Sequence, residues 1–474
     1  MDEPVRVGVD VGGTFTDVVL VVDDDVTTAK VPTKEVESEG VVAGIRAACQ
    51  TAGIDPSSVD SFRHGTTVAV NALLESTVAE TALVTTEGFG DVLAIGRQTR
   101  PSLYDLDARR PTPLVPAERR YEVAERATTD GIELTVDPSV LRELAAAIDA
   151  EAVAISFLHA YAHPENERRA AAILREELDV PVVASHEVLP AFREYERTAT
   201  TVADAALAPV VRKYLDELSD RVAERSEATD CESGSDRGER HANRVAEQSE
   251  AGLPQPRIMQ ANGGIADAAV VRERPISTVM SGPAAGVVGA SAIVSRTAQA
   301  DGSATASDGV VTLDMGGTST DVALVRDGEI ERTTAADVGG HPVRIPMVDV
   351  TTVGAGGGSI AHVDAGGALR VGPESAGAEP GPACYGRGGT EPTVTDAALQ
   401  LGYLGPETTL GDDLTLSTDA AATALSSLAD AADLDGPTAV AQGVLRVAIA
   451  TTTRAIRRVT VERGHDPRSL TLSA

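Results

Sequence analysis

Short apolar runs and longer amphipathic stretches alternate along this chain, which predicts a mixed α/β protein. Runs rich in Val, Ile and Ala between turn-forming residues are typical of strands, and they cover residues 5–9, 18–22, 82–85, 152–157, 180–184, 310–313 and 322–325. Apolar residues recur with helical spacing over residues 40–52, 141–150, 165–178 and 437–463. Pro164 stands directly before the third of these stretches as a helix-start signal. The last residues, 469–474, are predicted to form a strand.

The chain has 474 residues, enough for two or three domains with substantial cores. Residues 1–210 and 257–474 both have α/β character, whereas residues 223–256 are rich in Ser, Glu and Arg. Such a polar stretch has too little apolar surface to form a core, so we expect a disordered or loosely helical insertion. A smaller polar segment, residues 297–309, is expected to be a surface loop.

One motif occurs twice. Asp10-Val-Gly-Gly-Thr-Phe-Thr-Asp17 returns 304 residues later as Asp314-Met-Gly-Gly-Thr-Ser-Thr-Asp321, with matching apolar runs on both sides. Each copy predicts a strand, a tight glycine turn and a second strand. One copy on its own would fit an ordinary β-hairpin as well as it fits a phosphate-binding one. Two copies with matched flanks favour a pair of phosphate-binding hairpins.

The chemistry of the motif supports that interpretation. Glycines let backbone N–H groups approach a phosphate, and threonine hydroxyls add donors. An aspartate beside such a turn would repel phosphate unless it holds Mg²⁺, usually through water, or orients an attacking water. We therefore expect Asp10 and Asp314 to be catalytic and metal-binding residues. The expected phosphate-binding residues are Gly12, Gly13, Thr14, Thr16, Gly316, Gly317, Thr318 and Thr320. The chain lacks the G-x-x-x-x-G-K-[ST] motif of classical nucleotide-binding loops.

Acidic residues outnumber basic ones by 72 to 40, so the formal net charge is −32. Lysine occurs only at positions 30, 34 and 213. Acidic surfaces poor in lysine suit high salt, where screening weakens self-repulsion, so one hypothesis is a halophilic protein of a salt-adapted cytoplasm. The alternative is a merely acidic protein from a GC-rich genome. Either way the charge argues against a nucleic-acid partner.

Targeting signals and cysteine chemistry narrow the class further. No apolar run is long enough to span a bilayer, and the amino end lacks the regions of a signal peptide, so we expect a cytoplasmic protein without a membrane partner. Cys49, Cys231 and Cys384 are scattered, which argues against a disulfide framework or a thiolate zinc site. Cys384 is either a nucleophile or a residue without a chemical role.

Several further segments carry a family resemblance. They include His64-Gly-Thr-Thr, Arg193-Glu-Tyr-Glu-Arg197, Ser281-Gly-Pro-Ala-Ala-Gly286 and the glycine-rich residues 353–360, with residues 88–106, 259–264, 371–386 and 392–397. Together they resemble the hydantoinase/oxoprolinase family, specifically its ATP-binding A-type subunit. The two halves, each opening on a repeated hairpin, also resemble the two-domain fold of actin, sugar-kinase and heat-shock-chaperone ATPases.

The resemblance implies ATP-dependent opening of a cyclic amide, such as a hydantoin, N-methylhydantoin or 5-oxoproline. Phosphorylation of the amide oxygen would create an activated imidate that water can attack. ATP and Mg²⁺ are the implied cofactors, and a separate B-type subunit is the implied partner in a hetero-oligomer. The alternatives are the ATP-binding subunit of a ketone carboxylase and an inactive truncated remnant. A sugar kinase is more remote, because nothing outside the hairpins points to sugars.

Other candidate residues have competing explanations. His64 and Thr66 are expected to contact substrate or phosphate, although a histidine here could also cap a helix. The arginines Arg97, Arg100 and Arg197 can anchor a substrate carbonyl or carboxylate through a bidentate fork, or form solvated ion pairs. Asp396 is either a catalytic base or a helix cap. Gly356 and Gly357 belong to a third phosphate-binding loop or to a turn that needs positive φ.

The chain also departs from the family pattern. Members usually have Asp-Ile-His-Thr before the glycine run, where this chain has Asp349-Val-Thr-Thr352. The resemblance further implies a Gly-Gly-x-Gly-Pro turn beyond residue 474 that grips the nucleoside. We therefore expect the hairpins to hold the phosphates and a segment outside this sequence to hold the nucleoside.

Overall fold

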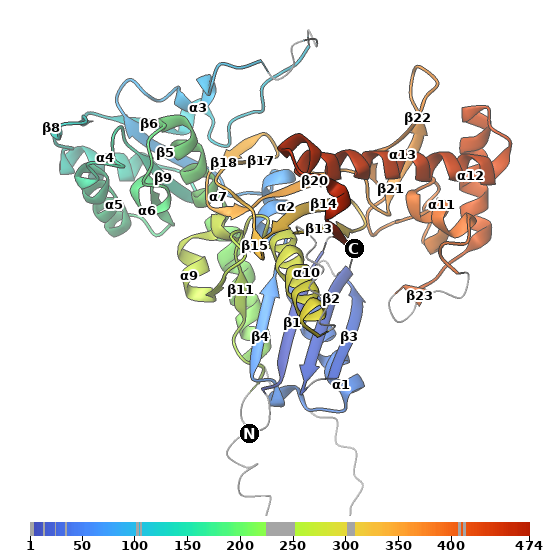
Figure 1. Ribbon diagram of the computed structural model, residues 1–474. Coiled ribbons are helices and arrows are strands. Elements are labelled where there is room, and N and C mark those ends of the chain that lie inside the picture. Colours follow the sequence, from blue (N-terminus) through green and yellow to red (C-terminus); the bar gives the residue numbers. More distant parts are fainter. Residues whose placement is uncertain are drawn as a thin grey trace, which may run out of the picture.

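The chain folds around two central sheets, with a lobe on either side of them (Figure 1). The structure is a computed structural model that describes residues 4–12, 15–23, 25–33, 36–100, 104, 107–223, 252–300, 309–405, 409–410 and 414–474. Most of the predicted polar insertion therefore lies outside the described residues. The mixed α/β class predicted from the apolar pattern is confirmed.

The first central sheet contains the first hairpin. Its strand order is β12–β11–β4–β1–β2–β3, with β1 at Arg6–Val11, β2 at Phe15–Val22, β3 at Asp25–Pro32, β4 at Ser61–Gly65, β11 at Arg257–Met259 and β12 at Ile265–Asp267. Strand β1 pairs antiparallel with β2, so that Asp10 lies opposite Asp17, and parallel with β4. Every second residue of β1 is buried, as the period of a strand requires. Helix α1 (Glu37–Ala52) packs closely on this sheet, because a Cβ at Gly44 would lie 2.7 Å from Cγ2 of Val18.

The second central sheet repeats this arrangement around the second hairpin. Strands β13 (Gly309–Met315) and β14 (Thr320–Arg326) pair antiparallel with Asp314 opposite Asp321, and β13 pairs parallel with β25 (Thr471–Ser473). Strands β15 (Glu329–Ile330) and β20 (Val350–Val353) both pair with β14. The predicted hairpins and the predicted last strand are confirmed, and each hairpin has the same neighbours in the same directions.

A lobe with a parallel sheet follows the first central sheet in the chain. Its order is β10–β9–β5–β6, with β5 at Thr81–Thr86, β6 at Arg120–Val123, β9 at Ala152–Ser156 and β10 at Val182–Ala184. Every residue of β5 and β9 is buried, as in a sheet covered on both faces. Helices α4 (Pro138–Ala147) and α5 (Glu165–Glu177) pack on it. The predicted strands and helices of this region are confirmed within a few residues.

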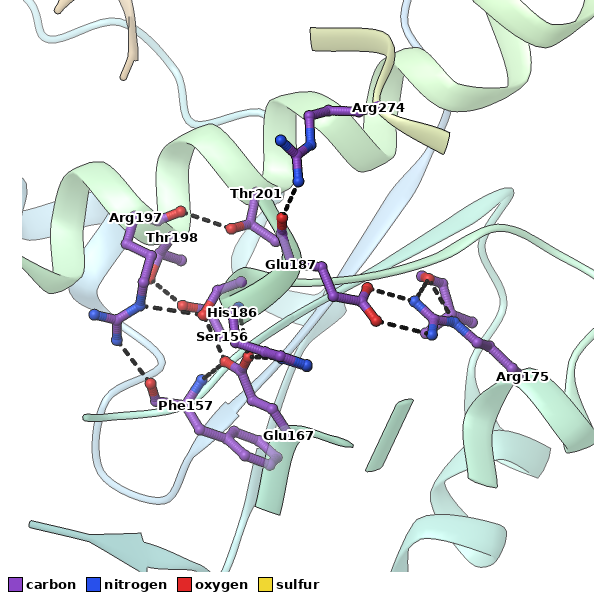
Figure 2. A network of polar contacts seen from close by, with 12 residues as sticks. Ser156, Phe157, Glu167, Arg175, His186, Glu187, Arg197, Thr198, Thr201 and Arg274 are labelled. Atoms are coloured by element: carbon purple, nitrogen blue, oxygen red, sulfur yellow. Dashed lines mark hydrogen bonds and ion pairs between the residues drawn. The ribbon is translucent and has the colours of Figure 1, made fainter. Parts of the chain in front are cut away.

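A long helix, α7 (Glu194–Ala223), joins this lobe to the first central sheet. Its first turn is held by a buried polar network (Figure 2). Arg197 donates to the carbonyl oxygen of Phe157 at 2.7 Å and to the hydroxyl of Ser185 at 3.1 Å. Glu167, which is fully buried, accepts from the Phe157 N–H and from Nδ1 of His186. The network fixes α7 against the parallel sheet.

The carboxyl-terminal part forms the other lobe. It contains β21 (Ser359–Val363), β22 (Leu369–Ser375), α11 (Val394–Gln400), α12 (Thr418–Ala432) and α13 (Gly436–Val459), which lie together on one side of Figure 1. Helix α13 confirms the long helix predicted near the carboxyl end, and its last turns pack on the second central sheet.

The structure differs from two expectations about domain organisation and loops. Strands β11 and β12 come after the predicted insertion, yet they extend the first central sheet, so a domain that begins at residue 257 does not correspond to a separate sheet. The expected loop at 297–309 is wrong at its start, because helix α10 (Ser281–Ala300) includes residues 297–300, and residues 301–308 lie outside the described residues. The three-part division itself stays a prediction.

Candidate functional site

Helix α10 brings the aspartates of the two hairpins to one place. A Cβ added at Gly282 would lie 3.5 Å from Oδ1 of Asp10, and one added at Gly286 would lie 3.3 Å from Oδ2 of Asp314. Residues four apart lie on the same helix face at neighbouring turns. The two carboxylates therefore line one face of α10, which contacts both central sheets (Figure 1). The sequence contained this pair of glycines, but no local pattern indicated what they face.

The end of strand β4 packs against the same aspartate. A Cβ at Gly65 would lie only 2.5 Å from Oδ1 of Asp10, so only glycine fits here without displacing the carboxylate. The next residue, Thr66, is 3% exposed, and its carbonyl oxygen accepts a hydrogen bond of 2.9 Å from the hydroxyl of Ser281. This bond ties β4 to the start of α10. Thr66 thus positions the site, and its own hydroxyl accepts from the N–H of Val68.

The electrostatics of the site are those of crowded carboxylates. Burial raises the pKa of Asp10 to about 6, and repulsion from Asp314 and Asp17 adds to the effect. Burial likewise raises the pKa of Asp321 to about 6, although a hydrogen bond from the Thr352 hydroxyl opposes the shift. Oδ1 of Asp10 is buried and has no hydrogen-bond partner among the described residues. Negative charge is therefore concentrated between the hairpins without full compensation.

The turns of the two hairpins are closed in the same way. The N–H of Gly12 donates to the carbonyl oxygen of Phe15, and the N–H of Gly316 donates to that of Ser319, both at 2.9 Å. These two amides are consequently engaged within the turns. Gly13 and Thr14 lie outside the described residues. In the second turn, the hydroxyl of Thr318 lies 3.4 Å from that of Ser375.

Two threonines expected to bind phosphate have another role. Thr16 and Thr320 are fully buried. The hydroxyl of Thr16 lies 3.4 Å from that of Thr33, and the hydroxyl of Thr320 donates to the carbonyl oxygen of Ala355 at 2.5 Å. Both side chains point away from the turns because strand alternation directs them into the protein. They hold neighbouring segments against the hairpins.

The glycine-rich run braces the second hairpin turn. The amides of Gly357 and Gly358 donate to the carbonyl oxygens of Gly316 and Gly317, and the amide of Gly356 donates to the hydroxyl of Ser359. A Cβ at Gly356 would lie 2.7 Å from those two carbonyl oxygens. The sequence offered two roles for Gly356 and Gly357, a phosphate-binding loop or a turn with positive φ. Their amides already donate to protein oxygens, and neither glycine has a positive φ, so the structure favours neither role. Close approach of two backbones is the reason for glycine here.

His64 lies in the core beneath this site. Its side chain is fully buried on strand β4, and Nε2 lies 2.6 Å from the hydroxyl of Tyr214 on α7. Burial lowers the pKa of His64 to about 4, so the ring is neutral near pH 7. His64 therefore neither faces a substrate nor caps a helix; its side chain joins β4 to α7.

Arg197 and Asp396 are also occupied by the protein. The guanidinium of Arg197 donates its hydrogen bonds within the network of Figure 2, and the residue is only 2% exposed. Arg197 is therefore not free to anchor a substrate, as the sequence had suggested. Asp396 forms a capping box with Thr393 at the start of α11, and its Oδ1 accepts from the N–H of Cys384 at 2.7 Å. Of the two explanations for Asp396, the structure favours the cap.

Arg97 is the one predicted arginine that lines a cavity. Its Nε donates to Oε1 of Glu196 at 2.7 Å, and the two side chains form a bidentate pair. The fork expected to hold a substrate carboxylate is therefore filled by a carboxylate of the chain. Arg100 is exposed and does not line this cavity.

The carboxylates of the hairpins suit a magnesium ion better than a metal held by protein side chains alone. No cluster of three or more His, Cys, Asp or Glu side chains with metal-binding geometry occurs within the described residues. Mg²⁺ commonly keeps several waters and needs only one or two carboxylates together with phosphate oxygens. The unpartnered Oδ1 of Asp10, with Asp314 nearby, fits that mode of binding.

Among the described helices, none combines the length and apolarity that crossing a membrane requires.

Two family models match most of this chain. Residues 6–178 match the hydantoinase/oxoprolinase N-terminal region, and residues 197–474 match hydantoinase/oxoprolinase. The caprolactamase alpha subunit of Pseudomonas jessenii is 38% identical over 98% of this chain and 64% of its own length. The 5-oxoprolinase of Saccharomyces cerevisiae is 31% identical over 97% of this chain and 37% of its own length.

Two solved structures share the fold. A nucleotide-free acetone carboxylase has a TM-score of 0.78 at 26% identity and covers 99% of this chain and 65% of its own. The ATP-dependent caprolactamase of Pseudomonas jessenii has a TM-score of 0.76 at 36% identity and covers 98% and 65%. The chain thus spans about two thirds or less of these proteins. On this evidence the chain belongs to the hydantoinase/oxoprolinase family.

Proposed function

We propose that this chain is the ATP-binding A-type subunit of an enzyme that opens a cyclic amide with ATP hydrolysis. The observation that carries the proposal is the pairing of Asp10 and Asp314 on one face of α10, each beside a glycine turn. Two carboxylates between two turns suit a triphosphate with its cation better than they suit an uncharged ligand. The names of the caprolactamase and 5-oxoprolinase relatives support a cyclic amide as the second substrate.

The repeated sheet topology supports an actin-like arrangement of the two halves. Each hairpin is followed in its sheet by a parallel strand, β4 or β25, so both turns lie at equivalent places. Because α10 contacts both sheets, a small rotation of one half would change the gap between the turns. Closure of that gap would exclude water while the phosphates are held.

The residues that would hold Mg²⁺ are Asp10 and Asp314, mainly through water. The cation would supply neutralisation of phosphate charge and of the crowded carboxylates. The raised pKa of Asp10, about 6, still leaves this carboxylate ionised above neutral pH. Asp10 and Asp314 would then orient water and phosphate, while the hydrogen bonds from Gly357 and Gly358 keep the second turn in position.

The reaction has three steps. The oxygen of the cyclic amide attacks the γ-phosphorus of ATP and displaces ADP, which leaves an O-phosphorylated imidate. Water then adds to the imidate carbon, and cleavage of the C–N bond with protonation of the leaving nitrogen opens the ring as an acyl phosphate. A second water hydrolyses the acyl phosphate to a carboxylate and free phosphate. A separate B-type subunit is proposed to complete the enzyme, consistent with the designation of the caprolactamase relative as a subunit. We also retain cytoplasmic location and salt adaptation as proposals.

A ketone carboxylase is the second candidate, because acetone carboxylase shares the fold with a TM-score of 0.78. Both chemistries begin with ATP-dependent activation of an oxygen, so the hairpins suit either one. An inactive remnant is the third candidate. Phosphate release separates the three: it depends on lactam in the first case, on ketone with bicarbonate in the second, and is absent in the third.

The test is phosphate release by the purified chain, alone and with a co-expressed B-type subunit. Asp10→Ala and Asp314→Ala are expected to lower ATP turnover at least a hundredfold, because each removes a charge at the phosphates. Asp130→Ala, at an exposed position remote from the hairpins, is the matched control. Turnover retained in the Asp10 and Asp314 variants, with an unchanged circular dichroism spectrum, would refute the assignment.

A further inference from the structure

A cavity of about 550 Å³ lies where distant parts of the chain meet. Its walls come from helix α3 (Val92–Ile95) and residues 96–99, from residues 110–114, from the first turns of α7, and from the turn between β17 (Ala336–Val338) and β18 (His341–Val343). These segments come from both family regions of the chain, before and after the polar insertion. The cavity is therefore a product of the tertiary fold.

The walls combine apolar side chains with several polar ones. Leu93, Ile95, Leu114, Ala199, Val202 and Pro342 contribute hydrocarbon surface. Apolar walls with a few convergent polar groups are typical of sites for small organic ligands. A compact ring of methylene groups would match this lining.

The charged groups at the cavity balance one another. Arg97 is paired with Glu196, and Arg110 and Asp337 also line the cavity. Two positive charges thus meet two negative charges. A ligand with its own carboxylate would add an uncompensated negative charge, whereas an uncharged ligand would leave the balance intact.

Polar groups suited to an amide remain. The hydroxyl of Tyr195 forms no hydrogen bond with the described residues, and burial raises the pKa of Tyr195, so it stays a donor. Burial lowers the pKa of His341, which leaves a neutral ring able to accept. Nη1 of Arg110 donates to the carbonyl oxygens of Ala94 and Ile95, and the guanidinium has further N–H groups that can donate to a ligand. Donors for a carbonyl and acceptors for an N–H are thus both present.

Two of the eight non-glycine residues with positive φ in the described part of the chain lie at or near the cavity. Gln98, which lines the cavity, has φ of 55°, and Arg193, two residues before Tyr195, has φ of 79°. Residues other than glycine rarely adopt this region, and such strain tends to occur at functional sites.

The cavity is connected to the nucleotide hairpins through helix α2 (Val68–Leu74). This helix begins just after Thr66, beside the Asp10 site, and ends where a Cβ at Gly339 would lie 3.5 Å from the carbonyl oxygen of Leu73. Seven residues of helix span about 10 Å. A change at the hairpins could thus reach the β17–β18 turn through one short rigid element.

We propose that this cavity takes up the cyclic amide before its oxygen meets the γ-phosphate at the hairpins, and that the Arg97–Glu196 pair makes the cavity prefer uncharged lactams over lactams that carry a carboxylate. The inference rests on the proposed function and specifies its substrate class. Glu196 acts by occupying the guanidinium fork that would otherwise take the ligand carboxylate. Arg97 and Glu196 are thus specificity residues.

The test compares three ligands by calorimetry without ATP, so that no turnover occurs. They are 2-pyrrolidinone, 5-oxoproline, and 5-oxoprolinamide, which has the size of 5-oxoproline without its charge. The wild-type chain should bind the two uncharged lactams with similar affinity and 5-oxoproline at least tenfold more weakly. Equal or tighter binding of 5-oxoproline, or no binding of any lactam, would overturn the proposal.

Variants assign the preference to the ion pair. Glu196→Gln should improve 5-oxoproline binding at least tenfold and change 5-oxoprolinamide binding less than threefold. Glu80→Gln, which removes the carboxylate of an ion pair with Arg119 outside the cavity, should change neither. An unchanged preference in a folded Glu196→Gln chain would overturn the proposal.

A second variant tests the amide contact separately. Tyr195→Phe keeps the ring that packs against Gly96 and removes the hydroxyl, so the affinity for 2-pyrrolidinone should fall about fivefold. Unchanged affinity would contradict the placement of the lactam. If these binding tests fail while lactam-dependent phosphate release is lost in Asp10→Ala, the proposed function stands and the cavity assignment falls.

Discussion

Replacing Asp10 by Asn should stabilise the fold above neutral pH while it disables the proposed nucleotide site. Asp10 is partly exposed, but its Oδ1 is buried without a hydrogen-bond partner among the described residues. Burial, together with repulsion from Asp314, raises the pKa of Asp10 from 3.8 to about 6. Folding therefore disfavours the ionised carboxylate. An asparagine of nearly the same shape removes this cost.

The sign and size of the change in unfolding free energy follow from the linkage between protonation and folding. Because the pKa of Asp10 is higher in the folded chain than in the unfolded chain, wild-type stability from this group is lost as the pH rises from about 4 to about 6. A shift from 3.8 to about 6 corresponds to about 3 kcal/mol at full effect. Solvent at the partly exposed carboxylate reduces this value, so the expected gain is about 1 to 3 kcal/mol at pH 7.5.

The assay is urea unfolding followed by circular dichroism at constant ionic strength, at several pH values from 4.5 to 7.5. The free energy of unfolding of Asp10→Asn should exceed that of wild type at pH 7.5, and the difference should shrink towards pH 4.5. Asp130→Asn, an exposed change of the same kind, should show no such trend. A destabilised Asp10→Asn chain, or a difference that does not vary with pH, would refute the reasoning.

Three other outcomes are expected. Gly356→Ala should weaken ATP binding at least tenfold in a titration with a fluorescent nucleotide, because its Cβ would meet the carbonyl oxygens of the second turn at 2.7 Å, and an unchanged affinity would contradict the role given to this close approach. Arg197→Lys should lower the free energy of unfolding by at least about 2 kcal/mol but leave the KM for lactam unchanged, and a raised KM without destabilisation would instead support substrate binding. Cys384, fully buried and with its thiol pKa raised by burial, should escape iodoacetamide at pH 8 until the chain is unfolded, as peptide mass mapping can show.

The local chemistry of the hairpins was readable from the chain. Strand period and glycine turns depend on neighbouring residues, so both hairpins, the helix α13 and the last strand could be predicted. The roles of side chains within those elements were harder to predict. Thr16 and Thr320 belong to the repeated motif, yet alternation along the strand directs them inward.

The sequence by itself determined the α/β class, the two hairpins and the family, because these depend on local pattern and on motifs. Only the tertiary structure decided which motif residues share a site. Gly282 and Gly286 face Asp10 and Asp314 from a helix that lies far from Asp10 in the chain. Arg197 and His64 lost their expected roles because distant segments bury them. Arg97 gained a carboxylate partner, Glu196, 99 residues away. Contacts at such separations follow from packing, which no local pattern encodes.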